Sequence, residues 1–462
     1  MQPSVENTYR VVRFMFLSSI VWLLIGMTFG LILALKYVWP EFLAFGPLQK
    51  YLQYGRIRPI HTNLVLLGWL TMAYLGAMFY IIPALTKTPL QYPRLAMIGG
   101  ILWNVFLIVG AVVLMNGMTD VIEYAEFPYF LDIVAVILMG VIATICFATI
   151  VRRREKKLYV SLWYFMGSLL WLPLLWIVGN LPPSWIPGVP RFNMAWFYGH
   201  NVIGLWFTTV GVGIIYYLLP KLANNPLYSH RLSLIGFWTI AAFYVWNGPH
   251  HIQNGPVPAW LMKSGVIPSV LMIIPVWTVV ANFFGTMKGK WHVAATNIPL
   301  RFLLTGVIFY LITCLQGPFQ SLMGPSSVIK FTNWVIGHAH LPLFGAFSFV
   351  CFAAIYTILP KITGRPLNST ALMNAHFWLS VGGFLLFASS MWTAGLIQGF
   401  AWMSGKQYGP AFVEVLVALR PYTMARALGG ALMVIGQFLF AYNVIRSLAP
   451  ARQATHPTAS TA

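Results

Sequence analysis

Long apolar runs separated by short polar segments extend along the whole chain. Taking roughly 20 apolar residues as one crossing of a bilayer, we expect twelve transmembrane helices, at residues 11–36, 61–84, 95–116, 129–151, 159–179, 194–219, 232–253, 263–286, 299–320, 331–360, 372–400 and 422–447. Residues 1–450 are therefore predicted to form a single all-α, polytopic membrane domain with twelve transmembrane helices. The polar residues 451–462 are expected to form a disordered tail. We find no convincing internal repeat.

Composition and charge agree with this prediction. Of the 462 residues, 59% are hydrophobic and 8% are charged, which is too little charge to cover a soluble globule of this size. The formal net charge of +20 argues for membrane topology rather than a nucleic-acid partner, because basic residues collect on cytoplasmic loops. Twelve spans place eighteen of the 28 Lys and Arg residues on the side of both termini. Both termini are therefore expected in the cytoplasm.

Six of the ten histidines lie inside or at the mouth of apolar runs. They are His61, His200, His250, His251, His338 and His340, and they come from four predicted helices. Because alternate spans run in opposite directions, all six are expected in the outer part of the bilayer. Ionisable side chains at such a depth are costly and mark functional sites. For any one histidine, a hydrogen bond to a neighbouring helix is an equally good explanation, but six at one depth favour a shared function.

The spacing of two of these histidines indicates how they could be used. His338 and His340 are separated by about 200° around a helix that advances about 100° per residue, so they point to opposite faces. One helix could thus ligate two metals, one on each side. This arrangement is awkward for a single zinc site and suits two hemes that flank the helix.

The adjacent pair His250 and His251 predicts a different site. Neighbours on a regular helix diverge by about 100°, so joint ligation needs a distortion, which Gly248 and Pro249 supply. With His200 they give a predicted three-imidazole site suited to copper, zinc or iron.

Tyr244 is the aromatic residue with the clearest candidate role. It precedes His251 by seven residues, and a regular helix would place both on nearly the same face. A phenol beside a metal can supply a proton and an electron. Ser233, further inward on that face, and Tyr216 could form a proton path from the cytoplasm. Their hydroxyls could equally serve interhelical hydrogen bonds.

Six segments, in order along almost the whole chain, resemble subunit I of the heme-copper oxidases. The similarity is greatest to the C family, the cbb3-type cytochrome c oxidases. The segments are RPIHTN, WFYGHNVIG, YSHRLS, FYVWNGPHHI, NWVIGHAH and ALRPYTMARALGG.

The resemblance implies roles for individual residues. His61 and His340 would be axial ligands of a low-spin heme b, and His338 would hold a high-spin heme b. Copper would bind to the three remaining histidines: His200, His250 and His251. Tyr244 would be covalently linked to His200, and Ser233 and Tyr216 would lie on a proton path. Four arginines would lie near the heme propionates: Arg56, Arg58, Arg420 and Arg426. Glu123 and Glu126 lie in a segment that resembles one that can hold calcium in the family.

The implied function is that of a terminal respiratory oxidase. Such an enzyme reduces dioxygen to water with electrons from cytochrome c, which arrive through partner subunits that carry heme c. It takes protons from the cytoplasm and couples turnover to proton pumping. The resemblance places the chain in the lipid of a bacterial inner membrane as a multi-pass subunit.

One departure from the family pattern leaves alternatives open. The family usually has a glutamate in an EGP motif where this chain has Gln316, and an amide cannot exchange protons. A divergent nitric oxide reductase of the same superfamily is the first alternative. Such enzymes usually carry a glutamate at the position of Gly204, so Gly204 and Tyr244 favour copper and dioxygen. The second alternative is a proton-coupled secondary transporter, which has no use for two histidines at heme-bridging spacing.

Overall fold

The computed structural model describes residues 3–120, 122–182, 184–404 and 412–449, so the tail expected at 451–462 lies outside the described residues. In the described part, regular structure is helical apart from one isolated bridge between Ile122 and Ala125. The first half contains α1 (Pro3–Val38), α2 (Leu48–Tyr51), α3 (Tyr54–Asn63), η1 (Leu64–Leu70), α4 (Thr71–Thr86), α5 (Pro93–Met115), α6 (Tyr129–Val151), α7 (Val160–Gly179), α8 (Val189–Val202), η2 (Ile203–Thr208) and α9 (Thr209–Ala223).

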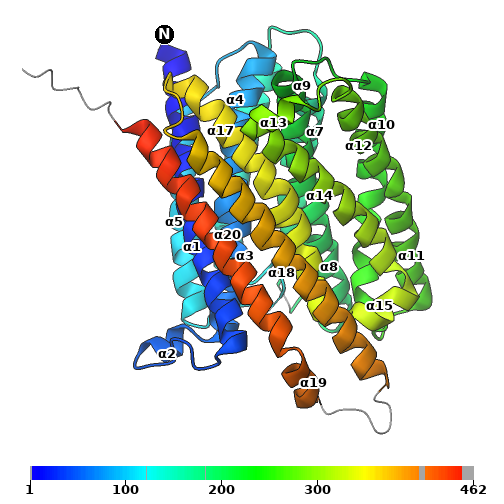
Figure 1. The fold of residues 1–462 in the computed structure, drawn as a ribbon. Coiled ribbons are helices and arrows are strands. Elements are labelled where there is room, and N and C mark those ends of the chain that lie inside the picture. Colours follow the sequence, from blue (N-terminus) through cyan, green and yellow to red (C-terminus); the bar gives the residue numbers. More distant parts are fainter. Residues whose placement is uncertain (1–2, 121, 183, 405–411, 450–462) are drawn as a thin grey trace, which may run out of the picture.

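The second half continues the bundle (Figure 1). It contains α10 (His230–Phe243), η3 (Tyr244–Trp246), η4 (Gly248–Ile252), α11 (Ala259–Leu271), α12 (Ile273–Thr286), α13 (Val293–Thr296), α14 (Ile298–Ser321), α15 (Met323–Ile329), α16 (Asn333–His340), η5 (Leu341–Ser348), α17 (Phe349–Thr363), α18 (Thr370–Ser404), α19 (Phe412–Ala418) and α20 (Arg420–Leu448). The long helices α18 and α20 run side by side along one face of the bundle (Figure 1).

Eleven helical segments of the described chain are long and apolar enough to cross a membrane. The remaining expected span, 232–253, is interrupted because α10 ends at Phe243 and the chain continues in 3-10 turns. Pro249 has no N–H to give to Val245, and the freed Val245 carbonyl accepts a hydrogen bond from Asn201 Nδ2 at 3.1 Å. The twelve-span prediction therefore holds with one broken span. The expectation that Tyr244 and His251 share a face of one regular helix is wrong.

Three spans form the centre of the bundle. They are Tyr54–Thr86, Val189–Ala223 and Asn333–Thr363. In their most apolar stretches, 89% to 94% of the residues are buried, whereas in the other eight spans only 39% to 56% are buried. Each central span contains a π-helical segment just after one of the conspicuous histidines: η1, η2 and η5. Such wide turns are frequent at functional sites.

Hydrogen bonds tie the wide turns of the three central spans together. Thr71 Oγ1 donates to the carbonyl of Leu66 at 3.0 Å, which also accepts the backbone N–H of Thr71. Trp206 Nε1 in turn donates to Thr71 Oγ1 at 3.2 Å, and Trp69 Nε1 donates to Ser348 Oγ at 2.8 Å. The positions of the three histidine-bearing segments are thereby fixed relative to one another.

The same three spans also end alike, which corrects the expectation that the chain has no internal repeat. Each ends four residues after a proline, at a residue in the left-handed conformation whose N–H donates to that proline's carbonyl: Lys87 after Pro83, Asn224 after Pro220 and Gly364 after Pro360. Their φ angles are 53°, 48° and 67°. The repeat is also visible in the sequence, as IIPALTKTPL, LLPKLANNPL and ILPKITGRPL.

Side-chain caps fix the starts of three helices that border the histidine sites. The side chains of Ser229, Asn297 and Thr332 each accept a hydrogen bond from a backbone N–H in the first turn of α10, α14 and α16. These caps satisfy donors that have no partner within the helix. They also set where α14 and α16 begin, and hence which side chains the two helices present to each other.

Candidate functional site

The first cavity lies between two facing histidines. It is lined by residues of α1, α3, η1, α16, η5, α18 and α20, and its empty volume is about 1330 Å³, including the space at its open end. The rings of His61 and His340 lie nearly parallel across it, with centroids 6.2 Å apart and an angle of 17° between their planes. A single metal ion could sit between them.

Backbone carbonyls orient both rings of this pair. His61 Nδ1 lies 2.7 Å from the carbonyl oxygen of Gly26, and His340 Nδ1 lies 2.8 Å from that of Ile336. A carbonyl oxygen only accepts hydrogen bonds, so each Nδ1 carries the proton and each Nε2 keeps its lone pair for a metal. A Cβ at Gly30 would lie 2.6 Å from the His61 ring, so only glycine at that position leaves room for this imidazole.

Arg426 brings a buried cation to the first cavity. Its side chain is 6% exposed, its guanidinium lies 4.7 Å from the centroid of the Tyr37 ring, and its Nε and Nη1 have no hydrogen-bond partner among the described residues. A buried guanidinium with unpaired donors requires an anion to be stable. Arg58 also lines the cavity, whereas Arg56 donates to the carbonyl of Met115 at 2.8 Å outside the cavity lining and Arg420 is exposed.

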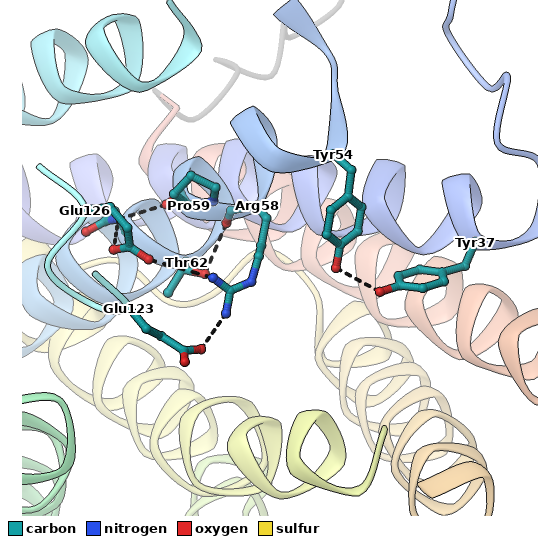
Figure 2. A network of polar contacts seen from close by, with 8 residues as sticks. Tyr37, Tyr54, Arg58, Pro59, Thr62, Glu123 and Glu126 are labelled. Atoms are coloured by element: carbon teal, nitrogen blue, oxygen red, sulfur yellow. Dashed lines mark hydrogen bonds and ion pairs between the residues drawn. The ribbon is translucent and has the colours of Figure 1, made fainter. Parts of the chain in front are cut away.

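Figure 2 shows the polar network at the mouth of this cavity. Arg58 pairs with Glu123 at 2.5 Å and lies 4.0 Å from Glu126, whose other carboxylate oxygen accepts a hydrogen bond from Asn63 Nδ2 at 3.0 Å. Burial raises the pKa of Glu126 to about 7. Arg58 therefore lies beside both glutamates, and its positive charge offsets theirs where the sequence predicted a calcium ion. The calcium site expected here stays a prediction.

The second cavity contains the three-imidazole site. Its lining includes residues of α8, η2, α10, α11, α14 and η5, and its empty volume is about 1600 Å³, including open space. One ring nitrogen from each of His200, His250 and His251 lies within 4.8 Å of the others, as expected for ligands of one metal ion. His200 Nε2 is buried without a hydrogen-bond partner, whereas His250 Nδ1 lies 2.7 Å from Ser269 Oγ. His200 Nδ1 lies 3.0 Å from His251 Nε2, and a metal ion held between the rings would account for this close approach.

His338 lines the second cavity as well, from α16. His340, two residues further on, lines only the first, so the two rings serve opposite sides of one helix as the spacing predicted. Ala339, between them, lines both cavities. His338 Nδ1 lies 3.1 Å from Gln316 Oε1 on α14.

Two aromatic rings stack on the three-imidazole site. Tyr244 stacks on His200 with centroids 4.5 Å apart and 16° between the planes. Trp196 stacks on His251 at 4.0 Å and 2°. A Cβ at Gly204 would lie 2.0 Å from the Tyr244 ring, so Tyr244 needs a glycine there. Sequence reasoning missed Trp196, although its spacing of one helical turn before His200 could have revealed it.

Lys330 is a second residue that sequence reasoning missed. It follows α15, lines the second cavity and donates from Nζ to the carbonyl of Gln253. Burial lowers the pKa of this ammonium group. Its apolar surroundings in the sequence gave no signal of this position.

The polar residues expected on the inner side are buried but lie apart from the second cavity. Ser233 is 1% exposed, and its hydroxyl donates to the carbonyl of His230 at 2.7 Å. The Tyr216 hydroxyl accepts a long hydrogen bond, 3.5 Å, from Asn282 Nδ2, which also donates to the carbonyl of Ser229 at 2.7 Å. Asn282 therefore connects the start of α10 to Tyr216.

Comparison with known proteins identifies the family. The sequence profile described as "Cytochrome C and Quinol oxidase polypeptide I" matches residues 10–432. The chain is 33% identical to the cbb3-type cytochrome c oxidase subunit CcoN1 of Stutzerimonas stutzeri, over 99% of this chain and 98% of that one. It is 32% identical to a cytochrome c oxidase subunit 1 homolog of Agrobacterium tumefaciens, over 95% and 83%. It is 30% identical to cytochrome c oxidase subunit 1 of Rhodobacter capsulatus, over 97% and 87%.

The fold is also that of a solved oxidase. A heme-copper terminal oxidase dimer determined by cryo-electron microscopy superposes with a TM-score of 0.79, at 17% identity, over 95% of this chain and 84% of that one. The chain therefore belongs to subunit I of the heme-copper oxidases, of the cbb3 type. It is an oxidoreductase of the cytochrome c oxidase class, as the sequence motifs predicted, and not a transporter.

Proposed function

We propose that this chain reduces dioxygen to water in the second cavity, with electrons that come from cytochrome c through partner subunits carrying heme c. The observation that carries the proposal is the cluster of three imidazoles with a stacked tyrosine in a cavity that a fourth imidazole, His338, also lines. Copper would be held by the clustered histidines, a high-spin heme b by His338, and a low-spin heme b by His61 and His340. When bound, these groups supply the electrons and the place where dioxygen binds.

The residues present fit these cofactors. The close approach of His200 Nδ1 and His251 Nε2 suits a shared metal, the parallel rings of His61 and His340 suit axial ligation, and the unpaired donors of Arg426 suit a propionate. Imidazole nitrogens suit copper, and Cys314, which lines the same cavity, is not part of the three-imidazole group.

Tyr244 would act as the local proton donor. Its stacking on His200 holds the phenol at the edge of the three-imidazole site, within the cavity lining. From there the hydroxyl can give up a proton when the O–O bond breaks. The proximity also suits a covalent link between the two rings, and mass spectrometry tests this. A cross-linked peptide pair containing His200 and Tyr244 is expected, and separate unmodified peptides from active enzyme would exclude the link.

Protons would enter from the cytoplasm, where both termini are expected. Ser233 and Tyr216 are proposed to lie on this route, and the bonds that Asn282 makes to Tyr216 and Ser229 support a polar passage there. Turnover would then be electrogenic and coupled to pumping in a bacterial inner membrane. Sealed vesicles test this by the voltage and acidification that accompany dioxygen consumption, and an electrically silent turnover would contradict it.

A divergent nitric oxide reductase is the alternative that the sequence left open. Such an enzyme would use a glutamate near the position of Gly204 to help bind iron. The 2.0 Å approach of a Cβ at Gly204 to the Tyr244 ring argues against any side chain there. This contact supports copper and dioxygen.

The deciding experiment is the ratio of copper to iron in the purified protein, together with its reduced optical spectrum. One copper per two b-type hemes is the expected result. A third, non-heme iron with no copper would overturn the proposal and favour nitric oxide reduction.

A further inference from the structure

The Nδ1 atom of each proposed heme ligand lies within hydrogen-bonding distance of an acceptor oxygen, but the acceptors are of two kinds. His61 and His340 donate to backbone carbonyls, at 2.7 Å and 2.8 Å. His338 meets a side chain, Gln316 Oε1, at 3.1 Å. A backbone carbonyl is present whatever the residue type, whereas the partner of His338 is set by the residue at position 316.

The Gln316 amide fixes the tautomer of His338. Gln316 Oε1 can only accept, so Nδ1 of His338 carries the proton and Nε2 keeps its lone pair. Gln316 itself is outside the lining of the second cavity, whereas His338 is part of it. The amide thus acts on the cavity only through the imidazole.

The neutrality of the amide has an electronic consequence. A carboxylate at this distance would draw the Nδ1 proton toward itself and give the imidazole anionic character, which strengthens its bond to ferric iron. A neutral amide oxygen at 3.1 Å leaves the imidazole a weaker donor. Hydrogen bonding to an axial ligand is one of the means by which a protein sets a heme potential. The chain has no Asp or Glu between Glu155 and Glu414, and Glu123, which lines the second cavity, is paired with Arg58.

We propose that Gln316 is a positioning residue that orients His338 and keeps it a neutral imidazole, and so holds the reduction potential of the high-spin heme above the value that a carboxylate would give. This inference rests on the proposed role of His338. It concerns the strength of the iron–histidine bond and does not require Gln316 to touch dioxygen or move a proton.

A matched control lies one helical turn away. Gln320 is on the same face of α14 and accepts a hydrogen bond from Trp334 Nε1 on α16 at 3.0 Å. It joins the same two helices as Gln316 but bonds an indole instead of an imidazole. Gln320 lines the second cavity, whereas Gln316 does not, so a substitution at 320 tests helix packing and a charge placed at the cavity itself, without changing the His338 hydrogen bond.

The experiment compares Q316L, Q316E and Q320E with the unmodified protein in the assembled oxidase. The reduction potential of the high-spin heme is measured by spectroelectrochemistry, and the iron–histidine stretching frequency by resonance Raman of the reduced enzyme. Q316L removes the acceptor, so we expect a lower stretching frequency and a higher potential. Q316E should shift both quantities in the opposite direction, and Q320E should leave the stretching frequency unchanged.

The outcomes separate this inference from the proposed function. If H338A still binds the high-spin heme, then the assignment of His338 fails. If H338A loses that heme but Q316L, with its heme bound, has the stretching frequency of the unmodified protein, then only the role of Gln316 is overturned. A shift of equal size in Q320E would also overturn it, because the effect would then come from charge or packing.

Discussion

The two cavities use the same residue type at the same depth for different ends. In the first, His61 and His340 face each other with centroids 6.2 Å apart, so a metal between them has both axial positions filled. In the second, His338 lines the same cavity as a cluster of three imidazoles, so the cavity would offer two proposed metal positions. The first arrangement suits electron transfer and the second suits binding of a small molecule. We propose that the arrangement of the imidazoles around each cavity decides which role the cavity takes.

The largest expected effect is a loss of function in the second cavity that leaves the first cavity intact. His250→Ala removes one of the three proposed copper ligands, so we expect loss of copper and a fall in dioxygen consumption of at least about 100-fold, since even outer-shell changes cost 10–100-fold. The low-spin heme spectrum should be unchanged. Metal analysis and oxygen-electrode rates measure this. His292→Ala, in an exposed loop, is the control. Retained copper in His250→Ala would contradict the assignment.

The reverse change tests the first cavity. His340→Leu removes one of two facing imidazoles, so we expect the six-coordinate low-spin signal to disappear while copper stays bound to the second cavity. Turnover should fall by about the same factor, because electrons no longer arrive. Optical spectroscopy together with copper analysis distinguishes the two losses. A low-spin spectrum that survives the substitution would show that another residue is the ligand.

A smaller effect is expected from steric change beside Tyr244. In Gly204→Ala the new Cβ would lie 2.0 Å from the Tyr244 ring, so the phenol must move away from His200. Misplacement by about 1 Å can cost about 100-fold in rate, so we expect turnover to fall by about 10- to 100-fold with both hemes bound. Gly140→Ala is the matched control, because a Cβ there meets nothing within 4 Å. Equal rates in the two variants would remove the proposed role of Tyr244.

Arg426→Gln should affect only the first cavity. Loss of the buried cation removes stabilisation of a nearby anion, so we expect a lower reduction potential for the low-spin heme and an unchanged potential for the high-spin heme. Separate redox titrations of the two hemes measure this. Equal shifts in both potentials would mean that Arg426 acts at long range on the whole protein.

The smallest expected effect concerns Glu126 at the mouth. Its pKa is raised to about 7, so between about pH 4.5 and 7 the folded protein holds a proton that the unfolded chain releases. The free energy of unfolding should therefore decrease as the pH rises through this range, by on the order of 3 kcal/mol at most. Half-lives at elevated temperature, with a chelator present, should be longer at pH 5 than at pH 8. Glu126→Gln should lose this difference.

The sequence determined the class of fold and the principal ligands. Runs of apolar residues predicted all eleven continuous spans of the described chain. The positions of His61, His200 and His338 within those runs identified them as candidate ligands. Such patterns are local, because burial in lipid and the helical repeat act on neighbouring residues. Pro249 likewise marked the break in the seventh span.

Only the tertiary structure decided which residues meet across helices. It brought Trp196 onto His251, Gln316 onto His338 and Lys330 into the second cavity, and it left Arg56 outside both cavities. Contacts between distant segments depend on how the helices pack and on where their wide turns and breaks fall, and these are set by the whole bundle instead of by any one segment.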